Sequence, residues 1–214
     1  MIRKWFDTRL PVRIFLKRRF RPFFNYLYSN PECQSRRMKN PTRPLSVNRA
    51  YISLGSNLGD APANLAAARD VVASFQGITI GAVSSVFRTE PQGMREQPFF
   101  LNQIMELGCS AQVEPLALLD LLLEAELALG RRRGAQRYGP RLIDLDLLLF
   151  GNKRMNNARL TLPHPRMLER AFVLVPLAEI APDLQLPQGM SAGRALASLQ
   201  YTQRGGTIFQ HQQY

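Results

Sequence analysis

The sequence predicts an α+β sandwich in which helices pack on a sheet with antiparallel pairing. Short apolar runs at 49–54, 78–87, 99–107 and 143–150 are typical of strands. Two stretches with helical spacing of apolar residues lie between them, and each stops at a glycine. Strands and helices therefore follow one another in mixed order, which favours this class. No internal repeat is visible, so one domain accounts for the folded part.

The composition is that of a globular protein. Hydrophobic residues make up 45% of the 214 residues and charged residues 21%, which excludes a chain that is disordered throughout. No apolar stretch approaches the roughly 20 residues that a membrane helix needs. Two cysteines are too few for a disulfide framework or a Cys-rich zinc site. We expect a cytoplasmic protein with no membrane partner.

The net charge of +12 is concentrated near the N-terminus. Residues 1–48 contain 12 Lys and Arg but two acidic residues, so they carry +10 and the remainder is nearly neutral. We expect 1–48 to be a basic, aromatic-rich extension, either disordered or an artefact of the start site if translation begins later, for example at Met38. A targeting peptide and an arm that binds nucleic acid or anionic membrane are the alternatives. Residues 49–214 form the expected domain.

The elements of the domain can be justified in order. The strand at 49–54 stops at Gly55-Ser56-Asn57, a turn signal. Asn57 or Asp60 can cap the following helix, which we expect to end at Gly77. Its apolar side carries Leu65, Ala68, Val72 and Phe75. The strands at 78–87 and 99–107 flank a segment, 88–98, that is too long for a tight hairpin and has a length typical of functional loops.

The clearest helix follows at 116–129. Pro115 stands at its start and Gly130 at its end, the positions that these residues favour. The strand at 143–150 comes next, and then a short helix near 166–170. The apolar segment 172–180 receives no assignment.

The strongest chemical signal is the stretch from Gly130 to Asp146. Five arginines fall within the eleven residues 131–141, directly before Asp144 and Asp146 in an otherwise apolar strand. Residues i and i+2 of a strand share a face, so the two carboxylates point the same way while their neighbours point to the core. Two like charges this close favour a cation between them, and carboxylates suit Mg²⁺. Because Arg binds phosphate oxygens, the stretch predicts a magnesium–polyphosphate site.

Other readings of these residues remain. An Asp pair on an exposed strand face, an Arg run in a solvated loop and a structural histidine such as His164 are each common alone. The P-loop and dinucleotide-binding motifs are absent, and no acyl-transfer triad stands out. The rival from another class is a nucleic-acid-binding protein that uses the arginines as a phosphate-backbone patch. That reading leaves Asp144 and Asp146 unexplained, because they would repel a phosphate backbone.

Several segments together resemble a known family. They are Tyr51–Gly59, Arg88–Pro91, Gln97–Asn102, Arg137–Leu148, and Leu162–Pro165 through Arg170–Phe172. In order and spacing, from about residue 49 to 185, they are similar to the 6-hydroxymethyl-7,8-dihydropterin pyrophosphokinase (2-amino-4-hydroxy-6-hydroxymethyldihydropteridine diphosphokinase) family. The resemblance implies a ferredoxin-like α+β sandwich with a mostly antiparallel sheet. It also implies transfer of diphosphate from MgATP to the pterin hydroxymethyl group, giving the pterin diphosphate and AMP in tetrahydrofolate biosynthesis.

The resemblance implies roles for individual residues as well. Asp144 and Asp146 would hold two Mg²⁺ ions that bridge the ATP phosphates, and with Arg131 and Arg133 of the loop that closes over ATP they form the catalytic set. The residues expected to bind ATP are Glu126, Arg131, Arg133, Arg141, Leu147, Arg159, Thr161, His164 and Arg170. Those expected to bind the pterin are Thr89, Glu90, Pro91, Gln92, Phe100, Asn102, Tyr138 and Phe172. Of these, Asn102 and the backbone of 89–92 would read its hydrogen-bonding edge, and Phe172 would stack on its ring.

Two positions depart from the pattern of the family. Tyr138 stands where some members have Trp, and Phe100 stands where Tyr can occur, which removes one hydroxyl contact. Glu126 falls at an acidic position of the family whose role the sequence does not explain. We expect ATP and the pterin as small-molecule partners, no nucleic acid for the domain, and a monomer. A degenerate member that acts only as a partner module is a further alternative, but the complete set of Arg and Asp residues disfavours it.

Overall fold

The computed structural model of the chain describes residues 48–94, 96–131, 139–187 and 189–210. The expected extension, apart from Asn48, lies outside these ranges. The predicted site residues Arg133 and Tyr138 lie outside them as well.

Within the described ranges, seven strands form one sheet in the order β5-β1-β4-β3-β9-β8, and β2 pairs with β4 beside β3. Their bounds are β1 (Asn48–Ser56), β2 (Ile78–Val83), β3 (Phe87–Thr89), β4 (Phe100–Cys109), β5 (Asp144–Phe150), β8 (Thr202–Arg204) and β9 (Thr207–Phe209). A separate two-stranded sheet consists of β6 (Met155–Asn156) and β7 (Thr161–Leu162). Only the pairing of β3 with β9 is parallel. The predicted antiparallel α+β class is confirmed.

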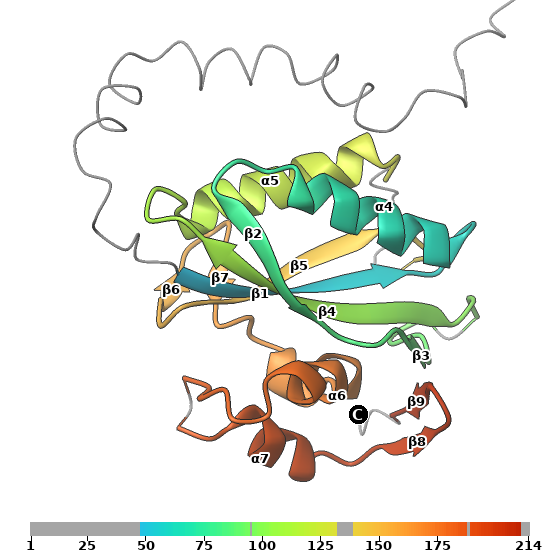
Figure 1. Ribbon diagram of the computed structural model, residues 1–214. Helices are drawn as coiled ribbons and strands as arrows, with labels where there is room; N and C mark the ends of the chain where they lie inside the picture. Colours follow the sequence, from blue (N-terminus) through green and yellow to red (C-terminus); the bar gives the residue numbers. More distant parts are fainter. Residues whose placement is uncertain (1–47, 95, 132–138, 188, 211–214) are drawn as a thin grey trace, which may run out of the picture. The chain divides into compact units, whose positions relative to one another are not determined.

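Helices cover both faces of the sheet (Figure 1). On one face lie α4 (Ala61–Ala73) and α5 (Pro115–Ala128). On the other lie α6 (Ala171–Ile180), the 3-10 turn η1 (Met167–Glu169) that precedes it, and α7 (Ala192–Ala197). The central strand β1 is buried from Ala50 to Ser56 because both faces and both edges are covered. Among the described helices, none is long and apolar enough to cross a membrane.

The predicted strand at 78–87 is wrong in one respect, because it is two strands. β2 pairs with the end of β4 and β3 with its beginning, and residues 84–86 separate them. At the break the Ser84 hydroxyl accepts a hydrogen bond from the backbone N–H of Ile104 at 2.9 Å. A side chain thus replaces a backbone carbonyl in the ladder, and the pairing of β2 with β4 shifts register between Ile80 and Val83.

The predicted helices are largely confirmed, with corrections at their ends. Asp60, and not Asn57, caps α4 by accepting from Ala63 N at 3.0 Å. The helix ends at Ala73 rather than near Gly77, because the Ser74 hydroxyl donates to the Val71 carbonyl and competes with the helical pattern. Phe75 therefore lies beyond the helix. The end of α5 is as predicted, with Gly130 in a left-handed conformation at φ 93°.

The later part of the domain contains elements that the sequence pattern did not assign. The short helix expected near 166–170 is the 3-10 turn η1, and the unassigned segment 172–180 belongs to α6. The helix α7 and the hairpin of β8 and β9 were not predicted. Burial of Leu148, Met167 and Leu174 in one cluster holds α6 against the sheet.

A pair of leucines on α5 tests the packing of this helix. Leu122 is fully buried, whereas Leu127 is 60% exposed. We expect Leu122→Ala to lower the free energy of unfolding by about 2 to 5 kcal/mol, since it leaves a cavity, and Leu127→Ala to change it by about 0.5 kcal/mol or less. Urea denaturation of the two variants measures both values. Equal losses would contradict the described orientation of α5.

Candidate active site

A cavity of about 480 Å³ opens on the side of the sheet that α6 covers. Its wall comes from the end of β1, the starts of β4 and β5, the segment that follows β3, and the segment from His164 to Phe172. Asp144 and Asp146 of β5 face it together, while Leu145 and Leu147 between and beyond them are buried on the other side. The predicted sharing of one strand face by the two carboxylates is confirmed.

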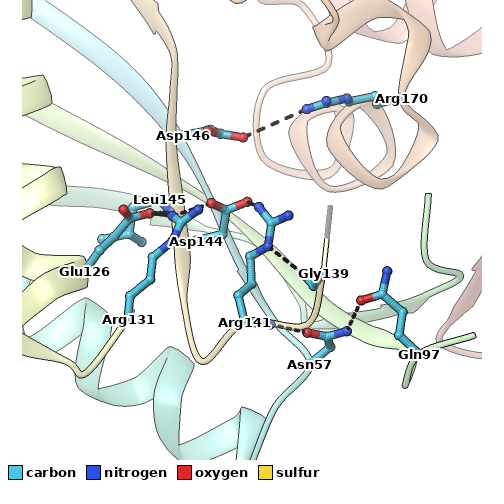
Figure 2. Close-up of polar contacts among 10 residues, drawn as sticks. All are labelled: Asn57, Gln97, Glu126, Arg131, Gly139, Arg141, Asp144, Leu145, Asp146 and Arg170. Atoms are coloured by element: carbon cyan, nitrogen blue, oxygen red, sulfur yellow. Dashed lines mark hydrogen bonds and ion pairs between the residues drawn. The ribbon is translucent and has the colours of Figure 1, made fainter. Parts of the chain in front are cut away.

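Arginine side chains neutralise the two aspartates (Figure 2). Arg131 Nη1 lies 2.6 Å from Asp144 Oδ1, and Arg141 Nη1 lies 2.7 Å from Asp144 Oδ2. Arg170 Nη1 lies 3.9 Å from Asp146 Oδ2. Burial raises the pKa of the Asp146 carboxyl, and the negative charge of Asp144 raises it further. The pair thus needs positive charge nearby in order to remain ionised.

Glu126 holds Arg131 from behind the cavity wall. Its buried carboxylate accepts a hydrogen bond from Leu145 N at 2.7 Å and forms an ion pair with Arg131. Burial raises the pKa of Glu126 to about 7, although the bonds from Leu145 and Arg131 oppose this rise. Burial lowers the pKa of the Arg131 guanidinium, but attraction to Asp144 and Glu126 outweighs it, so the net pKa is raised. Arg131 therefore stays charged and is shared by two carboxylates.

Arg170 and His164 supply further polar groups. Burial lowers the pKa of Arg170, and its Nε has no hydrogen-bond partner among the described residues. Burial also lowers the pKa of His164 to about 4, and the nearby charges of Arg170 and Arg166 add to this effect. His164 Nδ1 accepts from Arg166 N at 3.2 Å. The imidazole is therefore neutral at pH 7, and Arg170 keeps a donor available to a ligand.

The opposite end of the cavity combines amide, hydroxyl and aromatic groups. Asn102 Nδ2 donates to Thr89 Oγ1 at 2.6 Å, and both side chains are buried. The rings of Phe100 and Phe172 line the same cavity. Gly55 lies between the two ends, paired with Asn102 on one side and with Asp144 on the other. A Cβ at Gly55 would stand 2.9 Å from Asn102 Oδ1, so a larger residue here would require the Asn102 side chain to shift.

Asn57 joins the loops on either side of the cavity. Its Oδ1 accepts from Arg141 N at 2.8 Å, and its Nδ2 donates to Gln97 Oε1 and to the Pro98 carbonyl, each at 3.0 Å. Figure 2 shows the bonds to Arg141 and Gln97. Asn57 therefore fixes the backbone just before the aspartates, a role that the sequence analysis missed. The segment Tyr51–Gly59 was nonetheless among those that carried the family resemblance.

The cavity gathers most of the predicted site residues that the structure describes. Those that line it are Thr89, Glu90, Gln92, Phe100, Asn102, Arg131, Arg141, Asp144, Asp146, His164, Arg170 and Phe172. Pro91, Glu126 and Leu147 are not part of its lining. Arg159 forms an ion pair with Asp120 instead, and Thr161 donates to Asn156 Oδ1 at 3.2 Å. Residues that line it without having been predicted are Ser53, Gly55, Gly93 and Arg166.

The donor set of the cavity fits a hard divalent cation bound together with phosphate. In the part of the chain that the structure describes, no three His, Cys, Asp or Glu side chains converge on one point. The protein thus offers the two carboxylates of Asp144 and Asp146, which is typical of Mg²⁺ sites whose other ligands are phosphate oxygens and water. With arginines at this end and aromatic and amide groups at the other, the cavity suits a polyphosphate beside a flat polar ring.

Comparison with known proteins agrees with this chemistry. Residues 51–182 match the family described as 7,8-dihydro-6-hydroxymethylpterin-pyrophosphokinase (HPPK). A Methylorubrum extorquens 2-amino-4-hydroxy-6-hydroxymethyldihydropteridine pyrophosphokinase is 46% identical over 72% of this chain and 94% of its own length. The Bacillus subtilis protein of the same name is 44% identical over 64% of this chain and 81% of its own length.

A solved structure has a similar fold. A Plasmodium falciparum HPPK-DHPS triple mutant superposes with a TM-score of 0.58 at 14% identity and covers 73% of this chain. The chain spans 45% of the length of that protein. The expected ferredoxin-like α+β fold is confirmed.

The lowered pKa of His164 predicts a pH-dependent loss of stability. Between pH 6.5 and about 4 the unfolded chain protonates this residue while the folded chain does not, so the free energy of unfolding falls as the pH falls. We expect the unfolding free energy of the wild-type chain, relative to His164→Gln, to decrease by about 2 kcal/mol from pH 7 to pH 4.5. Denaturant titrations at both pH values measure it. Parallel pH profiles for the two proteins would contradict the burial of a neutral imidazole.

Proposed function

The chain belongs to the 7,8-dihydro-6-hydroxymethylpterin-pyrophosphokinase family, and we propose that the cavity beside β5 and α6 is where it carries out the reaction of that family. The enzyme transfers diphosphate from ATP to the hydroxymethyl group of 6-hydroxymethyl-7,8-dihydropterin in folate biosynthesis. ATP is the co-substrate, and the family generally uses Mg²⁺. The hydroxymethyl oxygen forms a bond to the β-phosphorus of ATP, the bond from that phosphorus to the oxygen of AMP breaks, and the hydroxyl proton is released.

The observation that carries the proposal is the placement of Asp144 and Asp146 on one strand face among three arginines. In the proposed complex the carboxylates of Asp144 and Asp146 would hold two Mg²⁺ ions. Bound Mg²⁺ neutralises charge on the phosphate oxygens. In the free protein, Arg131 and Arg141 pair with the Asp144 carboxylate. In the proposed complex with MgATP they pair with phosphate oxygens instead, so that their positive charge stays balanced.

The remaining groups at this end position the transferring phosphate. Transfer of this kind depends on alignment and on neutralisation of charge rather than on covalent help from the protein. Arg170 turns its available donor to ATP, and the neutral imidazole of His164 contacts ATP without adding charge. Glu126 holds Arg131 in reach of the site. Arg133, from the segment outside the described residues, completes the arginine set of the proposal.

The pterin occupies the other end in this proposal. Asn102 and the segment from Thr89 to Gln92 offer hydrogen bonds to the ring edge, and Phe100 and Phe172 offer flat apolar surface. Tyr138, which lies outside the described residues, is proposed as a further contact. Leu147, Arg159 and Thr161, which do not line the cavity, are proposed as further ATP contacts.

We also propose that residues 49–214 act as a monomeric catalytic domain in the cytoplasm. The lining residues lie between Ser53 and Phe172, within the expected domain. Cys109 is buried and forms no disulfide within the described part of the chain, which is compatible with a reducing compartment. A nucleic-acid-binding role is less well supported, because Arg131 and Arg141 point onto Asp144 rather than along an open surface.

The formation of AMP tests the proposed site. We expect the chain to release AMP from MgATP only when the pterin is present, and chelation of Mg²⁺ by EDTA to stop the reaction. Asp146→Ala removes one proposed metal ligand and should reduce kcat at least about 1,000-fold, since metal-dependent charge stabilisation is lost. Asp70→Ala, an exposed position on α4, is the control that keeps its activity. Release of ADP instead of AMP, or substantial activity of a folded Asp146→Ala variant, would contradict the assignment.

A second variant separates chemistry from binding. We expect Arg131→Ala to lower kcat by about 100-fold or more while the Kd of the pterin stays within about threefold, because Arg131 lies at the phosphate end. Single-turnover kinetics and fluorescence titration of the pterin measure the two quantities. The exposed Arg154→Ala is the matched control. Similar losses in kcat and in pterin affinity would make Arg131 a structural residue.

A further inference from the structure

The hairpin of β8 and β9 borders a small recess beside the cavity, although it lies beyond residues 51–182, which match the family. β9 pairs in parallel with β3, so that Ile208 stands beside Thr89. Ile208 is buried with Ala171 and Val175 of α6. These contacts place Gln210, two residues after Ile208, between the segment that follows β3 and the start of α6.

The amide group of Gln210 forms three hydrogen bonds to two separate parts of the chain. Its Oε1 accepts from Ala171 N at 2.7 Å and from Gln92 Nε2 at 3.2 Å. Its Nε2 donates to the Glu169 carbonyl at 2.8 Å. One side chain thereby joins the end of η1, the first residue of α6 and the segment after β3.

These bonds replace a cap that α6 otherwise lacks. Arg170, at the N-cap position, makes no capping hydrogen bond with its side chain. The first N–H groups of a helix have no partner within the helix, so a group from elsewhere must satisfy them. Gln210 does so for Ala171 from 39 residues further along the chain.

The two segments that Gln210 joins both contribute to the lining of the proposed pterin subsite, through Gln92 and Phe172. Phe172 directly follows Ala171, and Gln92 ends the segment that starts at Thr89. A small recess beside the main cavity is lined by Thr89, Glu90, Gln92, Phe172, Ile208 and Gln210. The Gln210 amide therefore sets the distance between the hydrogen-bonding segment and the aromatic ring.

We propose that Gln210 is a positioning residue of the pterin subsite, acting through Ala171 and Gln92 rather than touching the substrate. This inference rests on the proposed function, because it assigns the two sides of the recess to the pterin. A flat ring binds well only where the gap between its stacking surface and its hydrogen-bonding groups is held constant. Both the acceptor and the donor of the amide are used, so an apolar side chain of similar length loses all three bonds.

The test compares steady-state kinetics of full-length variants. Gln210→Met should raise the KM for the pterin about three- to tenfold, the range expected for lost hydrogen bonds. The KM for MgATP should change by less than about twofold, and the melting temperature by no more than about 4 °C. The matched control is Gln203→Met, because Gln203 is exposed on β8 and donates only to the nearby Gly205 carbonyl. This control should leave both KM values unchanged.

Phe172→Ala, measured in parallel, separates failure of the inference from failure of the proposed function. If Phe172→Ala raises the KM for the pterin and Gln210→Met does not, the positioning role is wrong and the pterin site stands. If Gln210→Met raises both KM values equally and lowers the melting temperature beyond this limit, Gln210 is a structural residue and the inference is overturned. If Phe172→Ala leaves the KM for the pterin unchanged, the assignment of the pterin site fails, and the role of Gln210 fails with it.

Discussion

Two carboxylates side by side on a buried strand require compensating charge, and the architecture of the site follows from this requirement. Asp144 is bonded by Arg131, which follows α5, and by Arg141, which precedes β5. Asp146 lies near Arg170, which precedes α6. Arginines from three different segments therefore meet at the start of β5. The same arginines that stabilise the aspartates suit a polyphosphate, so the balance of charge in the free protein prepares the site for MgATP.

Polar bonds to Glu126 and Asn57 hold this arrangement in place. Glu126 is buried beneath the site and bonds both to the backbone of β5 and to Arg131, so it links α5 to the aspartate strand. Asn57 links the backbone at Arg141 to the loop at Gln97 and Pro98. Gly55 lies between Asn102 and Asp144, where a Cβ would stand 2.9 Å from Asn102 Oδ1. The precision of the site therefore depends on polar bonds between segments as well as on apolar packing.

The proposed pterin end has a different origin. Its lining residues Thr89, Phe100, Asn102 and Phe172 come from β3, β4 and α6, and Gln210 near the end of the described chain bonds to the first residue of α6. Phe99 packs edge-on against Phe209 with ring centroids 6.4 Å apart, and the Arg88 guanidinium lies 4.1 Å from the Phe99 ring. The β8–β9 hairpin therefore packs against the residue that precedes β4 and, through Gln210, borders the proposed pterin end.

Much of the fold and of the site can be predicted from residues that lie close together in the sequence. The two-residue period of a strand places Asp144 and Asp146 on one face, and Pro115 and Gly130 mark α5, because these effects act within a few residues. Local patterns could not reveal the division of β2 from β3, which depends on the bond from Ile104 to the Ser84 hydroxyl. Nor could they reveal the roles of Asn57 and Gln210, whose partners lie up to 118 residues away. Only tertiary structure decides such contacts, because the pairing of distant strands brings their partners within hydrogen-bond distance.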